Sequence, residues 1–147
     1  MNTYILNLLP SLKSINSSIH GLLHWKRVAR NGKYLSDLNN ADYAVVKYFA
    51  YLHDSQRLND GDDLEHGYRA KVFIQSLIDQ SKLADLTDTQ QKQLMYACEY
   101  HSQDNIWSDD ITILTCIDSD RLDLTRLGIQ PDPCLLFTEF GKKLAIK

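Results

Sequence analysis

Residues 41–54 read ADYAVVKYFAYLHD, and this stretch sets the fold class. Val45, Phe49 and Leu52 recur at the three- and four-residue spacing that places side chains on one face of a helix. Asn40, directly before the stretch, has a side chain suited to cap the first turn. We therefore predict a helix that begins after Asn40 and turns an apolar face toward a core.

The rest of the chain follows the same pattern. Helices are predicted at the N-terminus, near residues 18–36, from about 64 to 80, from 87 to about 101, over roughly 109–122, and in a short segment after the prolines of the tail. The inward face of the 64–80 helix is expected to consist of Val72, Phe73, Leu77 and Ile78. Thr87 with Gln90 matches a capping box at the start of the next helix.

Little in the sequence favours a sheet, because Pro and Gly are few and no stretch alternates convincingly between apolar and polar residues. The chain has 147 residues, the length of one ordinary domain. The prediction is an all-α fold, a single compact helical domain over residues 1–147 with about six or seven helices.

Composition excludes several classes of protein. A net charge of −3 gives no basic field for nucleic-acid phosphates, so no dedicated nucleic-acid binding is expected. No apolar run approaches the roughly 18 residues that span a bilayer. Pro10 interrupts the apolar N-terminus, which we interpret as a first helix and not as a signal peptide. The three cysteines form no CxxC pair and are expected to be reduced, mostly buried thiols of a cytoplasmic protein.

The predicted helix over residues 41–54 ends in His53 and Asp54, an imidazole beside a carboxylate. His53 follows Phe49 by four positions and shares its inward face. Burying both groups is costly unless something neutralises and orients them. A divalent cation does both with ligands of this kind. The alternative is an ordinary hydrogen-bonded histidine beside a surface aspartate.

Other histidines and acids extend this pattern. His24 lies in a predicted amphipathic helix, His66 at a helix start and His101 at a helix end. Asp118 and Asp120 interrupt an apolar helix, where a buried carboxylate without a partner would be expensive. In chain order, the candidate metal ligands are His24, His53, Asp54, His66, His101 and an aspartate at 118 or 120.

Three segments resemble the HD-domain superfamily of metal-dependent phosphohydrolases: HWKRVAR around His24, YFAYLHDSQRL around His53 and Asp54, and DSDRLDL around Asp120. The order H…HD…D is the signature of that superfamily, and its members are all-helical. The resemblance covers the chain from about residue 18 to residue 130, the expected domain core. It implies an HD-domain-like fold with a divalent metal ion as cofactor.

By this resemblance, His24, His53 and Asp54 match the first three metal ligands of the superfamily. Asp120 matches the last ligand, because it aligns with the aspartate of an ADRLD-like stretch. Asp118 stands two residues earlier and would point elsewhere on the helix.

His66 and His101 resemble the two additional histidines of members with two metals. The alternative is that they are ordinary histidines at helix ends. His20 and His24 have the HxxxH spacing of zinc proteases, but Gly21 replaces the glutamate that such a site needs. His20 is expected to neighbour the site, where it either orients a ligand or is a partly exposed helix residue. One or two ions are expected, and manganese, iron, cobalt, nickel, zinc and magnesium all suit these ligands.

The resemblance implies hydrolysis of a small phosphorylated molecule, a nucleotide among the candidates, by metal-activated water. Asp54 would bind metal and orient the water. Arg57 is the preferred cation for the phosphate, ahead of Lys26, Arg27 and Arg121. Glu65 would donate a proton to the leaving group or simply favour a helix N-terminus.

Two functions of other classes stay open. An HD-type di-iron oxygenase would use His66 and His101 as further ligands, and oxygen-dependent turnover would identify it. A non-catalytic metal-containing binding module would hold metal without acting on phosphoesters. Within the superfamily, the GYP motif of cyclic-dinucleotide phosphodiesterases and the HDxxED motif of alarmone hydrolases are absent from this chain. The oligomeric state is left open.

Overall fold

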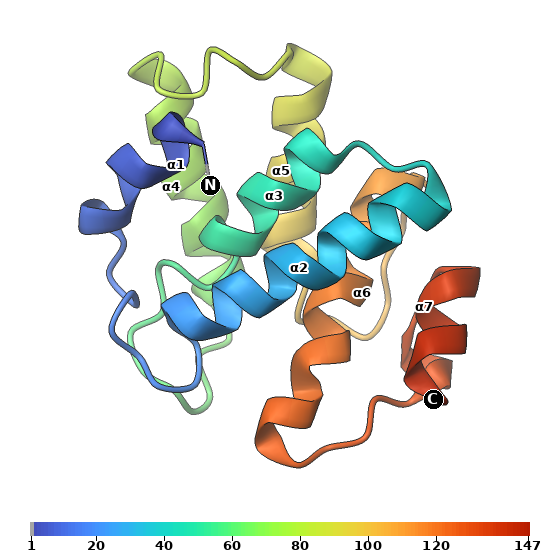
Figure 1. Cartoon of the computed structure of the whole chain (residues 1–147). Helices are drawn as coiled ribbons and strands as arrows, with labels where there is room; N and C mark the ends of the chain where they lie inside the picture. The colour runs from blue at the N-terminus through green and yellow to red at the C-terminus, as the bar shows by residue number, and fades with distance from the viewer. Residues whose placement is uncertain (1) are drawn as a thin grey trace.

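The computed structural model describes residues 2–147, and every regular element within that range is a helix (Figure 1). The α-helices are α1 (Thr3–Leu8), α2 (Leu22–Asn39), α3 (Tyr43–Leu52), α4 (His66–Asp79), α5 (Asp88–Tyr100), α6 (Ile111–Arg121) and α7 (Glu139–Ala145). Three short 3-10 helices join them: η1 (Leu9–Ser11), η2 (Leu122–Leu127) and η3 (Pro133–Leu135). The all-α prediction and the expected number of helices are confirmed.

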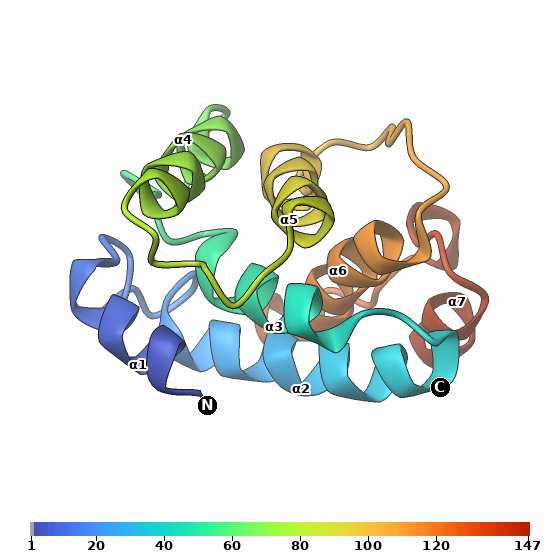
Figure 2. The same ribbon diagram turned by 90° about the horizontal axis from the view of Figure 1, so that it is seen from above.

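The helix α3 lies in the middle of the molecule. It packs against α2, α5 and α6, while α4 packs against α5 (Figure 2). The longest helix, α2, runs along one side and also contacts α6. The C-terminal helix α7 lies beside α2 and α6. Segments distant in sequence therefore surround α3 on several sides.

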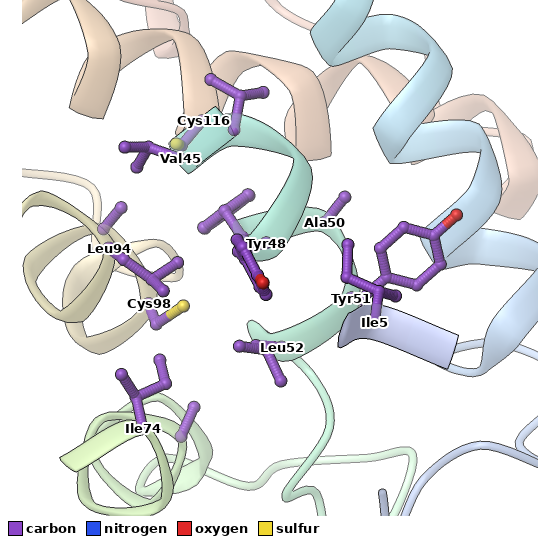
Figure 3. Packing of buried hydrophobic residues seen from close by; sticks show 14 of the residues in the cluster. Ile5, Val45, Tyr48, Ala50, Tyr51, Leu52, Ile74, Leu94, Cys98 and Cys116 are labelled. Carbon is purple, nitrogen blue, oxygen red and sulfur yellow. The ribbon is translucent and has the colours of Figure 1, made fainter. Parts of the chain in front are cut away.

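The sequence of α3 explains this central position. Its buried residues are Val45, Val46, Tyr48, Phe49, Ala50, Tyr51 and Leu52, so the helix is apolar around most of its circumference. Figure 3 shows α3 side chains packing among Ile5, Ile74, Leu94 and Cys98 from other parts of the chain. Each fully buried large apolar side chain contributes roughly 1.5–3 kcal/mol to folding. The predicted apolar face is confirmed and is wider than expected.

The predicted N-cap of this helix is wrong by two residues. Asp42 caps α3, because its side chain accepts a hydrogen bond from the Ala44 N–H. Asn40 instead ends α2 in the left-handed conformation, with φ of 56°. Asparagine suits both positions, since it caps helix starts and also tolerates positive φ at helix ends.

Two predictions about α4 and α5 have opposite outcomes. Thr87 and Gln90 form the predicted capping box at the start of α5, each side chain bonding to the other residue's backbone N–H. Val72 was predicted to face inward from α4, but it is half exposed. Leu77 is buried as predicted, Phe73 and Ile78 pack partly buried against the core, and Ala70 and Ile74 are buried in addition. The buried stripe is therefore shifted away from Val72.

The aspartate Asp118 fastens the C-terminal segment to α6. Its carboxylate is fully buried and accepts hydrogen bonds from the backbone N–H groups of Phe137 and Thr138 and from the Thr138 hydroxyl. Gly141 lies directly over this carboxylate, where a Cβ atom would come within 2.3 Å of Asp118 Oδ2. We call these four residues the C-terminal clasp.

Two of the three cysteines, Cys98 and Cys116, are buried, and Cys134 is exposed. The prediction of mostly buried thiols is confirmed. Within residues 2–147 no helix is both long and apolar enough to cross a membrane.

Candidate metal centre

Five of the predicted metal ligands lie at or next to the ends of five different helices, and these ends meet at one place. His24 lies in the first turn of α2, His53 directly follows α3, His66 begins α4, His101 directly follows α5, and Asp120 lies in the last turn of α6. All four histidines are buried. Backbone carbonyls near three of these helix ends, and the Asp123 carboxylate beside α2, help to orient the imidazoles, as described below. We call His24, His53, Asp54, His66, His101 and Asp120 the histidine cluster.

The imidazoles of the histidine cluster are arranged as two pairs. The Nε2 atoms of His24 and His53 are 3.2 Å apart. The Nε2 atoms of His66 and His101 are 3.0 Å apart. Each pair joins two consecutive helices, α2 with α3 and α4 with α5, across 29 and 35 residues of sequence. The pairing therefore depends on how the helices pack and not on local structure.

Asp54 lies between the two pairs and turns one carboxylate oxygen toward each. Its Oδ2 atom is 3.4 Å from His24 Nε2 and 3.3 Å from His53 Nε2. Its Oδ1 atom is 3.3 Å from His66 Nε2 and 3.5 Å from His101 Nε2. A single carboxylate in this position could serve two ions at once.

Asp120 faces only the first pair. Its Oδ1 atom is 3.1 Å from His24 Nε2 and 3.4 Å from His53 Nε2. The potential ligand atoms of His24, His53 and Asp120 lie within 4.8 Å of one another, as do those of His53, Asp54 and His101.

The other ring nitrogen of each histidine is bound to an oxygen atom, which fixes the tautomer. The Nδ1 contacts are His24 to Asp123 Oδ2 at 2.7 Å, His53 to Phe49 O at 3.0 Å, His66 to Asp63 O at 2.5 Å and His101 to Cys98 O at 2.6 Å. A carbonyl or carboxylate oxygen accepts a hydrogen bond, so Nδ1 carries the hydrogen, and Nε2 is the atom that would present a lone pair to an ion. Metal-binding histidines have this arrangement.

The residues present fit a metal ion. Two neutral Nε2 lone pairs about 3 Å apart repel each other, and neither can donate to the other. Two nitrogens bound to one ion at about 2.1 Å and at a right angle would be about 3.0 Å apart, close to both observed spacings. Imidazole nitrogen and carboxylate oxygen are also the donors that divalent transition ions accept.

Electrostatics in the histidine cluster also favour a cation. Burial alone would lower the pKa of His24, but the carboxylates around it, Asp120 foremost, raise it to about 9. Burial likewise opposes the charged form of His53, yet Asp54 and Asp120 raise its pKa to about 10. Burial would raise the pKa of Asp54, whereas the imidazoles hold it well below its usual range. The carboxylates therefore stay ionised and favour positive charge beside them, which a bound cation would supply in place of protons on His24 and His53.

Of the predicted cations, Arg57 is the one that reaches the histidine cluster. Its Nε donates to Asp54 Oδ1 at 3.2 Å, and its Nη1 donates to the backbone oxygens of Asn59 and Gly61. Arg121 donates to the carbonyls of His101, Gln103 and Leu135. Arg27 donates to Asp123, and Lys26 is exposed.

Two other predicted residues lie at the margin. Glu65 is exposed at the N-cap of α4, next to His66, and its side chain makes no cap hydrogen bond. The His20 ring lies 6.4 Å from the His24 ring, centroid to centroid, and its Nδ1 contacts Asp60 at 2.9 Å. His20 lies beside the histidine cluster, as expected, but it is buried and stands in the turn before α2, so the alternative of a partly exposed helix residue is wrong and the helix begins later than predicted.

One functional residue is absent from the sequence predictions. Asp123 binds His24 Nδ1 and also accepts two hydrogen bonds from Arg27 Nε, at 2.9 and 3.1 Å. It follows Asp120 by three residues, which places both on one helical face. That spacing in DSDRLDL was the available signal.

A pocket of about 230 Å³ opens beside the histidine cluster. His101 and Asp120 line it on one side, and Leu124, Leu135 and Leu136 provide apolar walls. Solvent or a small molecule can therefore approach the cluster from this direction.

Comparisons with known proteins support the fold. No family model matches the chain, and no curated protein matches it. The crystal structure of a "predicted HD superfamily hydrolase" from an uncultured Thermotogales bacterium is similar, with a TM-score of 0.72 and 21% sequence identity. The match covers 97% of this chain and 81% of that one. The resemblance to the HD-domain superfamily is thus confirmed at the level of the fold.

Proposed function

We propose that the protein is a metal-dependent phosphohydrolase that acts on a small phosphoester or pyrophosphate, with nucleotides among the candidate substrates. One observation carries the proposal: the Nε2 atoms of four histidines converge on two carboxylates, and within residues 2–147 Arg57 Nε is the one protein donor besides these imidazoles that reaches either carboxylate. The shared fold with a predicted HD superfamily hydrolase supports it.

The two histidine pairs suggest how ions would be divided. His24, His53 and Asp120 would hold one ion, His66 and His101 would hold a second, and Asp54 would contribute an oxygen to each. Bound ions of this kind acidify a water molecule and neutralise charge on a phosphoryl oxygen.

The chain's own residues position these groups. Arg57 holds the Asp54 carboxylate through Nε and is itself held by two backbone carbonyls, so its guanidinium stays beside the cluster. Asp123 fixes the His24 ring from behind. We propose that Arg57 contributes positive charge near the phosphate while it orients Asp54. A fixed cation of this kind favours the developing anion without reorganisation.

The pocket beside the cluster would take the part of the substrate that does not react. Its leucines suit an apolar or aromatic group, and Asp104 and Asp132 at its edge suit hydroxyl or amino donors. Arg121 also lines it, but three backbone carbonyls already occupy its guanidinium. Glu65 is exposed at the start of α4 and contacts none of the cluster side chains. The proposal therefore does not depend on Glu65 as the proton donor to the leaving group.

The test begins with metal analysis of protein purified without chelator or metal-affinity resin, followed by turnover of a panel of phosphoesters. We expect about one to two ions per chain and phosphate release. His53→Ala and Asp54→Ala should abolish both and keep the helical circular-dichroism spectrum. His20→Ala is the matched control, since it removes a neighbouring histidine outside the cluster and should keep the metal. Wild-type turnover by either cluster variant would refute the assignment.

A di-iron oxygenase is the second candidate, because the structure does bring His66 and His101 to Asp54. Iron at about two ions per chain, with oxygen consumption and no phosphate release, would place it ahead of hydrolysis. Phosphate release under anaerobic conditions would exclude it as the main activity.

A further inference from the structure

A second pocket lies behind the histidine cluster, between the chain before α2 and the 3-10 helix η2. Its volume is about 490 Å³, and it is lined by Ser18, Ile19, Arg27, Thr125, Arg126 and Leu127, with Asp123 at its base. None of the six cluster residues lines it. We call it the arginine pocket.

Both arginines have hydrogen-bonding capacity left over. Arg27 uses only its Nε, which donates to Asp123, and its two Nη groups have no protein partner within residues 2–147. Arg126 donates from Nε to Ile19 O and from Nη1 to Asp123 O, and its Nη2 has no partner in the same range. Their backbone and carboxylate contacts hold both guanidinium groups in place before any ligand arrives.

The charge of the arginine pocket is positive. Two guanidinium groups face a single carboxylate, Asp123, and that carboxylate is also bound to His24 Nδ1. No other acidic residue lines the pocket. The arginine pocket thus carries an excess of positive charge, although the whole chain has a net charge of −3. The exposed surface of α2 continues it with Lys26 and Arg30.

The chemistry of the lining selects one kind of ligand. A guanidinium presents several N–H donors in a planar fork, which matches the oxygens of a phosphate group. The Ser18 and Thr125 hydroxyls can donate to the remaining phosphate oxygens. Ile19 and Leu127 supply apolar walls for a group attached to the phosphate.

We propose that the arginine pocket binds the phosphate group of inorganic phosphate or of a small phosphorylated molecule, at a site separate from the histidine cluster. The inference uses no residue that the proposed reaction requires for chemistry, so it stands whether or not the protein is a phosphohydrolase. Arg27 and Asp123 connect the two places, because one Asp123 carboxylate contacts both Arg27 and His24.

Titration calorimetry with inorganic phosphate tests the proposal on the full chain, before and after chelator treatment. We expect phosphate binding that persists after chelation and that weakens about tenfold or more in Arg27→Ala, which loses a charge-assisted donor pair. Arg30→Ala is the matched control: it removes the same charge three residues along α2, outside the pocket, and should change affinity less than about twofold. Binding that disappears with chelator, or that is equal in Arg27→Ala and Arg30→Ala, would overturn the proposal.

A second variant tests the arginine pocket in case Arg27→Ala does not fold. Thr125→Val keeps the side-chain volume and every hydrogen bond described above, and it should weaken phosphate binding severalfold without lowering the melting temperature. Unchanged affinity in Thr125→Val together with an unfolded Arg27→Ala would also count against the site.

Adenosine 5′-monophosphate, titrated in parallel into chelated protein, distinguishes the two sources of the phosphate group. Equal Arg27-dependent affinity for both probes means that the arginine pocket recognises phosphate alone. Tighter Arg27-dependent binding of the nucleotide means that Ile19 and Leu127 contact the attached group. Absence of Arg27-dependent binding of either probe refutes the proposal, whatever the phosphoester assays show.

Discussion

Asp118 and Asp120 stand two residues apart on one helix, yet the protein surrounds them with opposite chemistry. Asp118 accepts three hydrogen bonds from the C-terminal clasp, all from N–H or O–H donors of the protein itself. Asp120 instead faces the Nε2 atoms of His24 and His53, whose Nδ1 atoms already bond to oxygen atoms. The chain supplies Asp118 with backbone and hydroxyl donors, whereas the partners of Asp120 are imidazoles that we propose as metal ligands.

The difference between these carboxylates also appears in their protonation. Burial raises the pKa of Asp118, and its backbone donors only partly offset this. Burial would raise the pKa of Asp120 too, but His53 and His24 hold it well below its usual range. A buried acid whose partners are ordinary donors indicates a structural role. A buried acid whose partners are imidazoles able to bind a metal ion indicates a candidate binding site.

Replacing Asp120 should produce the largest effect. Asp120→Asn removes the charge that balances His24 and His53, so we expect metal affinity to fall about 100-fold or more and phosphoester turnover to fall with it. Metal content after dialysis and turnover at saturating metal check this. Full metal retention by Asp120→Asn would mean that Asp120 is not a metal ligand and that its role does not differ from that of Asp118.

The matched variant Asp118→Asn should do the reverse. It weakens three buried hydrogen bonds of the C-terminal clasp, and we expect a loss of about 2–4 kcal/mol in the free energy of unfolding. Urea unfolding followed by tryptophan fluorescence measures the loss. Metal content per folded chain should stay at the wild-type value, and a parallel loss of metal would show that the clasp and the cluster are not separate.

Asp123→Asn tests whether a residue that only supports His24 also affects metal affinity. The change weakens the support of His24 Nδ1 without removing any proposed ligand, and such partners typically alter metal affinity about 10- to 100-fold. Competition with a metal-binding dye measures the affinity. Wild-type affinity in this variant would remove Asp123 from the description of the site.

Gly141→Ala should have the smallest effect of the four, and it acts on the clasp alone. The added methyl group would meet Asp118 Oδ2 at 2.3 Å and must displace it. We expect a cost of about 1–2 kcal/mol in the free energy of unfolding, smaller than that of Asp118→Asn. Thermal unfolding compares the two variants, and an unchanged melting temperature would show that the segment after Pro133 moves freely.

Local features of this fold were predictable from the sequence, whereas pairings between distant residues were not. The capping box of α5 was predicted because both partners lie within one helical turn. The cap of α3 was misplaced because Asn40 and Asp42 each suit a helix boundary. Val72 was misplaced because the spacing of apolar residues allows more than one inward stripe.

The same distinction applies to the candidate site. The six residues of the histidine cluster were named from their order and surroundings, and the structure brings them together. The four histidines form two pairs around Asp54 because of where the helix ends meet in the folded chain. The sequence of one segment alone does not predict this arrangement. Asp123 was missed for that reason, because its value lies in a contact with His24 across 99 residues of sequence. Their roles as ligands stay predictions until metal is measured.

Because the residues of the histidine cluster lie at the ends of different helices, a bound metal ion would also affect the stability of the fold. An ion bound to His24, His53 and Asp120 would tie α2, the end of α3 and α6 at one point, as a crosslink does, and a second ion would tie α4 and α5 through His66 and His101. Closing such long loops is entropically unfavourable for a disordered chain, and the ion would offset that cost only once the helices meet. Metal binding would then add to the stability of the folded chain, and a cell short of metal would hold less folded protein as well as less active protein.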